Sequence, residues 1–358
     1  MVVAARWVGV LSFMSACAHT GYVDWTVPAT QPSANLQPSG HTRNVVVVTI
    51  DGVRWQEVFE GLDPTRARDL PARDPVPNLR RFFTAGVVVG APGHGDMMAS
   101  GPSFVSLPGY REILTGRAST CGSNLCGQIR ERTLLDELSA EGVGPLAVIS
   151  SWGAIERAAA VDTRSLVIST GQRGGMTRER VRVSADASAL LDRTSPAFPG
   201  WLDYRPDRQT APLALAYLQA ARPRFLFIGL GDTDEYAHRG DYAGYVASLT
   251  AADRFVGTLM ATLATLGEYG ADTTVIVTTD HGRAANFSGH GSSTPESGRV
   301  WMFVAGGAVA ARGAIDTHDA RLADIAPTVR AWMGLGKDRS PTAGQARLSP
   351  TLLAAGQP

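Results

Sequence analysis

Short apolar runs rich in β-branched residues alternate along the chain with longer stretches of helical periodicity. The runs predict buried strands at 44–50, 87–89, 145–150, 224–229, 273–279 and 300–305. Apolar positions at helical spacing predict helices at 77–85, 132–140, 210–221, 242–266 and 321–333. Such alternation predicts an α/β fold with a mostly parallel central sheet and helices on both faces. Residues 171–206 form the least regular stretch and are expected to cross the active-site face.

The N-terminal segment has the pattern of an export signal. Arg6 precedes a short apolar stretch, 7–14, which is too short to span a membrane. Small residues then lead to Cys17, as in a bacterial lipobox, so residues 1–17 are interpreted as a lipoprotein signal. An ordinary signal peptide with an incidental cysteine is the alternative. Residues 18–42, rich in Pro, Ser, Thr and Gln, are expected to be a flexible tether before a domain at 43–358.

Composition argues against nucleic-acid binding and raises the question of whether two cysteines form a disulfide. The 33 basic and 33 acidic side chains balance, so no electrostatic footprint for nucleic acid exists. Lys337 is the only lysine. Export would leave Cys121 and Cys126 in an oxidising compartment, which favours a short-loop disulfide, although two unpaired thiols are also compatible with the spacing.

Acidic and imidazole side chains follow three of the predicted strands. Asp51 comes directly after the first strand, and Asp280 and His281 follow the strand at 273–279. Asp234 follows the strand at 224–229 after a short loop, and His238 lies four residues further on, one helical turn away. Ligand groups in parallel sheets gather beyond the carboxyl ends of the strands, so these residues are expected to meet.

Two further residues complete the candidate site. His290 lies between two glycines, which lets its imidazole approach a metal closely. Ser106 precedes Leu-Pro-Gly and is expected to be a helix N-cap, with backbone N–H groups nearby that would bind phosphoryl oxygens. Three carboxylates and three imidazoles suit zinc, although manganese could compete. A hydroxyl beside such cations is a candidate nucleophile.

On these fragments the chain resembles the alkaline phosphatase superfamily, in particular its nucleotide pyrophosphatase/phosphodiesterase, phosphoglycerate mutase-like and bacterial alkaline-phosphatase-like branch. The resemblance implies two divalent metal ions and in-line phosphoryl transfer to Ser106. It implies a first metal held by Asp51, Ser106, Asp280 and His281. It implies a second metal held by Asp234, His238 and His290.

Departures from the family pattern narrow this hypothesis. Gly109 stands where the phosphodiesterase relatives are expected to carry an Asn that binds the phosphoryl group. That contribution must come from another residue, and the candidates are Asn124, Arg157 and Arg283. Sulfatases of the superfamily require an Arg where this chain has Tyr110, and they use active-site lysines, so a sulfatase is disfavoured.

The sequence therefore predicts an exported, lipid-anchored periplasmic or outer-membrane hydrolase of small phosphate esters, either monoesters or diesters. The lipid anchor would be its only membrane attachment. Two alternatives remain: a sulfatase or phosphonate hydrolase of the same superfamily, and a catalytically weak, metal-stabilised binding protein.

Overall fold

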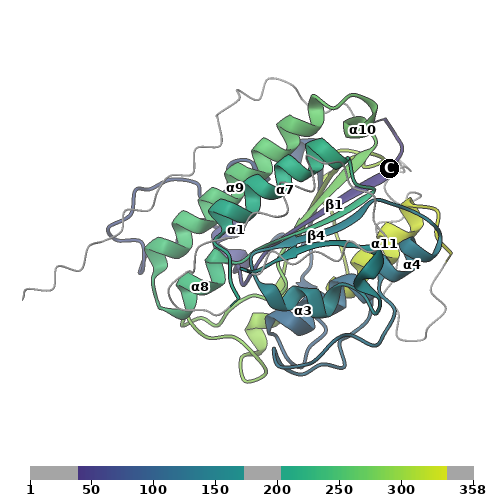
Figure 1. Cartoon of the computed structure of the whole chain (residues 1–358). Helices are drawn as coiled ribbons and strands as arrows, with labels where there is room; N and C mark the ends of the chain where they lie inside the picture. The colour runs from purple at the N-terminus through teal and green to yellow at the C-terminus, as the bar shows by residue number, and fades with distance from the viewer. Residues whose placement is uncertain (1–38, 173–202, 337–358) are drawn as a thin grey trace, which may run out of the picture.

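The structure is a computed structural model that describes residues 39–172 and 203–336 (Figure 1). Its core is an eight-stranded sheet with the order β10-β2-β9-β7-β1-β6-β4-β5. These strands are β1 (Asn44–Ile50), β2 (Gly86–Val89), β4 (Leu146–Ser150), β5 (Val167–Thr170), β6 (Phe225–Leu230), β7 (Thr273–Thr278), β9 (Met302–Gly306) and β10 (Gly313–Ala314). A small three-stranded sheet contains β3 (Met97–Met98), β8 (Arg299–Val300) and β11 (Ala320–Arg321). Only β9 runs antiparallel to its neighbours in the large sheet, so the predicted mostly parallel sheet is confirmed.

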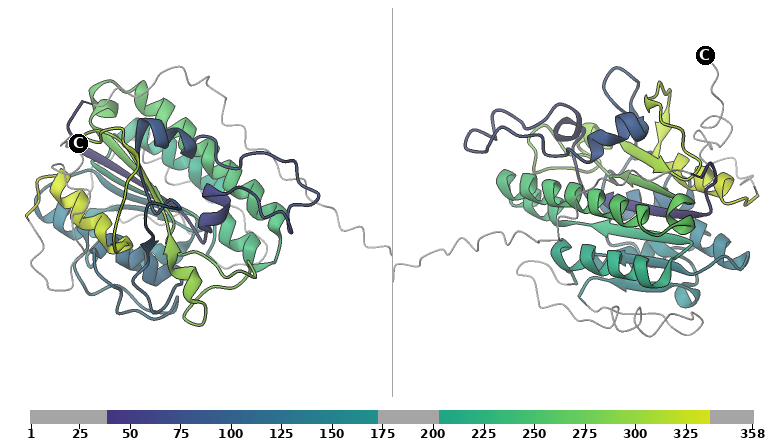
Figure 2. Two further views of the ribbon diagram at one scale, coloured as in Figure 1. Left: turned by 180° about the vertical axis from the view of Figure 1, so that it is seen from behind. Right: turned by 90° about the horizontal axis from the view of Figure 1, so that it is seen from above.

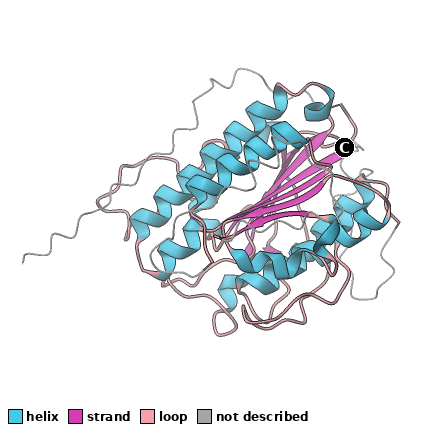
Figure 3. Ribbon diagram, in the orientation of Figure 1, coloured by secondary structure: helices cyan, strands magenta, loops and turns pink. Residues whose placement is uncertain are grey.

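Helices cover both faces of this sheet, as predicted (Figures 2 and 3). One layer contains α1 (Trp55–Phe59), α7 (Asp207–Ala221) and α9 (Tyr242–Ala264), and the other contains α3 (Ser106–Thr115), α4 (Leu134–Ala140) and α11 (Ile325–Trp332). Shorter helices are α2 (Phe82–Ala85), α5 (Glu156–Ala159), α8 (Asp232–His238) and α10 (Glu268–Ala271). Successive β1 side chains alternate between two buried cores, because strand side chains point to opposite faces.

The register of the three central strands brings their carboxyl ends level. β1 pairs in parallel with β6 on one side, with Ile50 opposite Leu230. On the other side it pairs with β7, with Thr49 opposite Thr278. The residues that follow these three strands therefore emerge at one edge of the sheet.

Several predicted elements are shorter or divided in the structure. The helix expected at 77–85 is a 3-10 turn (Leu79–Arg81) followed by α2, and the helix expected at 321–333 begins with a 3-10 turn (Leu322–Asp324). The strand expected at 300–305 is split between the two sheets at Trp301. This indole is fully buried and donates from Nε1 to the Val53 carbonyl at 3.2 Å, so a side-chain contact interrupts the apolar run.

The segment assigned to the tether reaches the domain earlier than expected. The backbone N–H groups of Ser39 and Gly40 donate to the carbonyls of Ala271 and Gly307, and Thr42 bonds to Thr274. The predicted signal and lipobox at 1–17, and most of the 171–206 stretch, lie outside the described residues. Across 39–172 and 203–336, no helix has both the length and the apolarity for a membrane span.

Candidate metal centre

All seven residues proposed from the sequence lie together beyond the carboxyl ends of the central strands. Asp51 follows β1, whereas Asp280 and His281 follow β7. Asp234 and His238 lie on α8, one turn apart, directly after β6. Ser106 is the first residue of α3, and the remaining member of the set, His290, lies in the loop after β7.

One group of potential ligands surrounds the Ser106 hydroxyl. Ser106 Oγ lies 3.3 Å from Asp51 Oδ1 and 3.3 Å from His281 Nε2. The same His281 nitrogen lies 3.4 Å from Asp51 Oδ1 and 3.5 Å from Asp280 Oδ2. One ligand atom from each of Asp51, Asp280 and His281 falls within 4.8 Å of the others. The hydroxyl therefore lies against two members of a buried group of three residues that can bind a cation.

A second group adjoins the first and contains Asp234, His238 and His290. Asp234 Oδ2 lies 3.0 Å from His238 Nε2, and Asp234 Oδ1 lies 3.8 Å from His290 Nε2. The two imidazole Nε2 atoms lie only 3.1 Å apart. His281 joins the groups, because its ring stacks on His290 at 4.0 Å and its ligand atom also lies within 4.8 Å of those of Asp234 and His290.

Two of the imidazoles are oriented as neutral metal ligands. His281 Nδ1 lies 2.8 Å from the Gly282 carbonyl, and His290 Nδ1 lies 2.9 Å from the Phe104 carbonyl. A carbonyl can only accept, so each Nδ1 carries the proton and each Nε2 turns its lone pair toward the site. Burial lowers the pKa of His281 to about 4 and that of His290 to about 3, which keeps both rings neutral.

Two carboxylates are each anchored through one oxygen. Tyr110 donates its hydroxyl to Asp51 Oδ2 at 2.7 Å, and the Gly52 N–H donates to Asp280 Oδ1 at 3.1 Å. The buried Asp280 Oδ2 has no hydrogen-bond partner among the described residues. Burial raises the pKa of Asp280 to about 7, and burial with the nearby Asp280 and Asp234 carboxylates raises that of Asp51 well above its usual value. A bound cation would stabilise the ionised form of both buried carboxylates, so the site fits a divalent metal.

Gly52 leaves space for the two groups of candidate metal ligands to lie close together. Its φ of +61° lies in the left-handed region, which favours glycine. A Cβ at this position would come within 2.5 Å of Asp234 Oδ1 and 2.6 Å of Arg283 Nη1. The Asp-Gly pair after β1 is therefore more than a turn signal, because any side chain at position 52 would fill the space between the two groups.

The structure does not favour Arg283 as the phosphate-binding residue. Its buried guanidinium forms an ion pair from Nη1 with Asp234 Oδ1, and it donates from Nε and Nη2 to the carbonyls of Phe287 and Ser288. Although burial opposes ionisation of Asp234, Arg283 and then His238 lower the pKa of that carboxyl well below its usual value. Arg283 therefore keeps Asp234 ionised and joins α8 to the loop that leads to His290.

Ser106 is not the N-cap that the sequence predicted. Val105 is the N-cap residue of α3, with φ −136° and ψ 163°, and Ser106 is the first helical residue. The expected supply of free backbone N–H groups is also smaller, since Leu107 donates to Asn124 Oδ1 at 2.9 Å and Pro108 has no N–H. The missing N–H of Pro108 is evident from the sequence, whereas the bond from Leu107 to Asn124 could not be predicted, because Asn124 meets α3 only in the fold.

Position 109 cannot carry the phosphate-binding side chain of the predicted relatives. A Cβ on Gly109 would lie 2.4 Å from the Asp280 carbonyl oxygen. Here α3 packs directly against the backbone of a candidate ligand. Glycine at this position therefore permits close packing. The side chain that takes over phosphate binding from the missing Asn must come from outside α3.

Compared with those of known proteins, the fold and the site both resemble the alkaline phosphatase-like class. The sequence family described as the Metalloenzyme superfamily matches residues 204–337, the part that contains Asp234, His238, Asp280, His281 and His290. A search of curated protein sequences finds no match.

Solved structures share the fold at low sequence identity. A 2-O GAG sulfatase has a TM-score of 0.58 and 14% identity, with 88% of this chain and 75% of that chain covered. An alkaline phosphatase superfamily protein from Vibrio parahaemolyticus has a TM-score of 0.54 and 15% identity, with coverages of 89% and 74%. Alkaline phosphatase from the Antarctic bacterium TAB5 has a TM-score of 0.52 and 12% identity, with coverages of 83% and 100%. The family match and these neighbours confirm the resemblance to the alkaline phosphatase superfamily.

Proposed function

We propose that this chain hydrolyses phosphate esters, with Ser106 as the nucleophile. The observation that carries the proposal is the position of the Ser106 hydroxyl, 3.3 Å from both Asp51 Oδ1 and His281 Nε2, beside a second group of ligands. Asp51, Ser106, Asp280 and His281 would hold one divalent cation, and Asp234, His238 and His290 would hold the other. Zinc is the metal that this ligand set favours. Two such cations, when bound, would stabilise charge on the transferred group and favour the serine alkoxide.

The proposed reaction has two steps. Ser106 Oγ loses its proton to solvent water and forms a bond to phosphorus while the bond from phosphorus to the leaving oxygen breaks, and that oxygen takes a proton from solvent. Water then attacks phosphorus, the Ser106 Oγ–phosphorus bond breaks, and Ser106 Oγ takes up the proton that the water loses. The product is inorganic phosphate from a monoester or a phosphate monoester from a diester. Tyr110 holds Asp51 from behind, which leaves Asp51 Oδ1 facing the nucleophile.

Asn124 is the residue that we assign to the missing phosphoryl contact. The Leu107 N–H fixes the orientation of its side chain, since only the amide oxygen can accept that bond. The amide nitrogen then makes no hydrogen bond within the described parts of the chain. Because Leu107 directly follows Ser106, we place this donor near the nucleophile, where it would donate to an oxygen of the transferred phosphoryl group.

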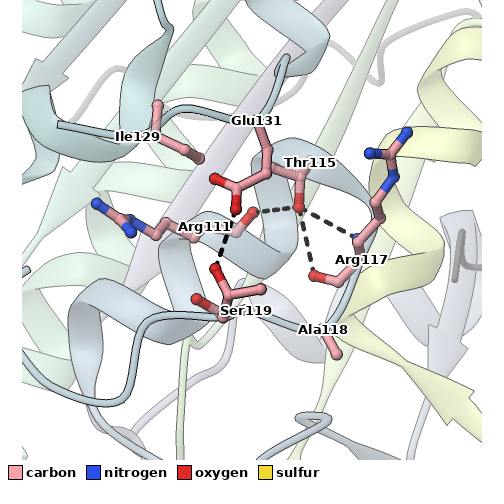
Figure 4. A pocket seen from close by; sticks show the side chains of 8 residues that line it. Arg111, Thr115, Arg117, Ala118, Ser119, Ile129 and Glu131 are labelled. Atoms are coloured by element: carbon pink, nitrogen blue, oxygen red, sulfur yellow. Dashed lines mark hydrogen bonds between the residues drawn. The ribbon is translucent and has the colours of Figure 1, made fainter.

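Tyr110 distinguishes this site from the sulfatase pattern. It is buried and bonded to Asp51, so it cannot replace the arginine of that pattern. The adjacent Arg111 does not replace it either, since its guanidinium donates to the Gly127 carbonyl and lines a cavity on the C-terminal half of α3 (Figure 4). These contacts support the proposal that the nucleophile is an unmodified serine.

A substrate panel tests the proposal on metal-loaded protein. Nitrophenyl phosphate or bis-nitrophenyl phosphate is expected to be hydrolysed faster than nitrophenyl sulfate, and the two phosphates separate monoesterase from diesterase activity. Mass spectrometry of the peptide with residue 106 is expected to show serine or phosphoserine. Faster sulfate hydrolysis with formylglycine at 106 would favour the sulfatase, and no hydrolysis of any ester would favour the binding protein.

A further inference from the structure

The loop that supplies Asn124 has little packing of its own. Most of residues 122–128 are exposed, and Leu125 at the tip is 89% exposed. A cavity of about 210 Å³ lies beside the residues that flank this loop in the sequence. Figure 4 shows it between Arg111 and Thr115 of α3 and the loop residues Ser119, Ile129 and Glu131. Apart from Cys121 and Cys126, which pack against the core, hydrophobic packing therefore does little to fix the position of this loop.

Specific polar contacts and one covalent bond hold the loop instead. A disulfide joins Cys121 and Cys126, which the sequence had favoured over free thiols. On one side, the Ser103 hydroxyl donates to the Gly122 carbonyl at 2.6 Å. On the other side, Arg157 on α5 approaches the same loop. Asn124 lies inside the ring that the disulfide closes.

Arg157 makes the contacts closest to Asn124. Its Nη1 donates to the Cys126 carbonyl at 2.7 Å, and its Nη2 donates to the carbonyl of Asn124 itself at 3.2 Å. The Arg157 carbonyl also accepts from the Ile129 N–H at 2.9 Å. The Asn124 main chain is therefore held by Arg157, while its side chain is held by the Leu107 N–H.

We infer that Arg157 is a positioning residue for the hydrolytic site and that it acts through Asn124, together with the disulfide. Arg157 is thus not a substrate-binding residue in this account, although the sequence made it a candidate for direct phosphate contact. Its two guanidinium bonds set the position of the Asn124 amide relative to Ser106. Because small displacements of a transition-state donor are costly, loss of this support lowers turnover without touching substrate. The inference rests on the proposed function, since it needs Asn124 to act on the substrate.

A mutant cycle on the metal-loaded protein tests the inference. Asn124→Ala is expected to lower kcat/KM by about 10²-fold, the loss seen when one oxyanion donor is removed. Arg157→Ala is expected to lower it by about 10-fold to 100-fold, with metal content unchanged. In the Asn124→Ala background, Arg157→Ala should change kcat/KM by no more than about twofold. Arg157→Lys should recover part of the activity, and the exposed Arg130→Ala is the matched control.

Two readouts do not depend on activity. Hydrogen exchange of the amides in residues 121–129 should quicken in Arg157→Ala and in the Cys121→Ser/Cys126→Ser double variant, with β1 still protected. The double variant should also lose activity in the same range as Arg157→Ala.

The outcomes separate failure of this inference from failure of the proposed function. An Arg157→Ala enzyme within about twofold of wild type, or one with an equal loss in both backgrounds, overturns the positioning role. Unchanged activity in Asn124→Ala overturns the role of Asn124 and with it the inference. Full activity in Ser106→Ala instead overturns the proposed function.

Discussion

Ser106→Ala is expected to lower kcat/KM for the best phosphate ester by a factor on the order of 10⁴ to 10⁶, as for other covalent nucleophiles. The hydroxyl is the only group at this position that can form the phosphoseryl bond, and an alanine methyl group cannot replace it. Asp51, Asp280 and His281 keep their anchors in this variant, because none depends on the Ser106 side chain for orientation. Metal should therefore still bind.

The measurement pairs steady-state kinetics with elemental analysis of each purified variant. Ser139→Ala is the matched control, since this hydroxyl lies on α4 and contacts Ser165 rather than the site. The control should keep full activity. Undiminished turnover in Ser106→Ala with metal retained would remove Ser106 from the mechanism.

His281→Ala is expected to weaken metal binding by more than about 100-fold, because loss of even an outer-shell partner commonly costs 10-fold to 100-fold. Its Nε2 lies within 3.5 Å of both Asp51 and Asp280, so one group loses a ligand directly. Its ring also stacks on His290 at 4.0 Å, so the other group loses a packing surface. Both ions should therefore be affected.

His238→Ala provides the contrast, since His238 contacts Asp234 and His290, which are both members of the second group. Titration calorimetry of metal-depleted protein should show one tight site left in His238→Ala and none in His281→Ala. The half-exposed His94, whose Nδ1 contacts Asp316, is the matched control. Unchanged binding of two ions by His281→Ala would contradict the assignment of the ligands.

The sequence was informative where a residue's role follows from its place after a strand. Asp51, Asp234 and Asp280 follow β1, β6 and β7, and the parallel register of these strands makes their convergence predictable. The i,i+4 spacing of Asp234 and His238 likewise suits the α8 helix that carries them. These are local patterns combined with one general property of parallel sheets.

The supporting contacts could not be predicted, because each joins residues that only the fold brings together. The bond from Tyr110 to Asp51 crosses from α3 to β1, and the ion pair of Arg283 with Asp234 crosses from a loop to α8. Nothing in the spacing around Gly109 shows that α3 packs against the Asp280 carbonyl. A single sequence identifies the chemical groups, whereas their orientation depends on packing.

The central claim is that these side chains hold two cations beside one serine hydroxyl. Anomalous diffraction from crystals of the protein, recorded at the absorption edge of the metal found by elemental analysis, tests it most directly. The account predicts two peaks, one within bonding distance of Asp51, Asp280 and His281, and one within bonding distance of Asp234, His238 and His290. Metal-supplemented crystals with no peak there, or with metal bound only elsewhere, would contradict it.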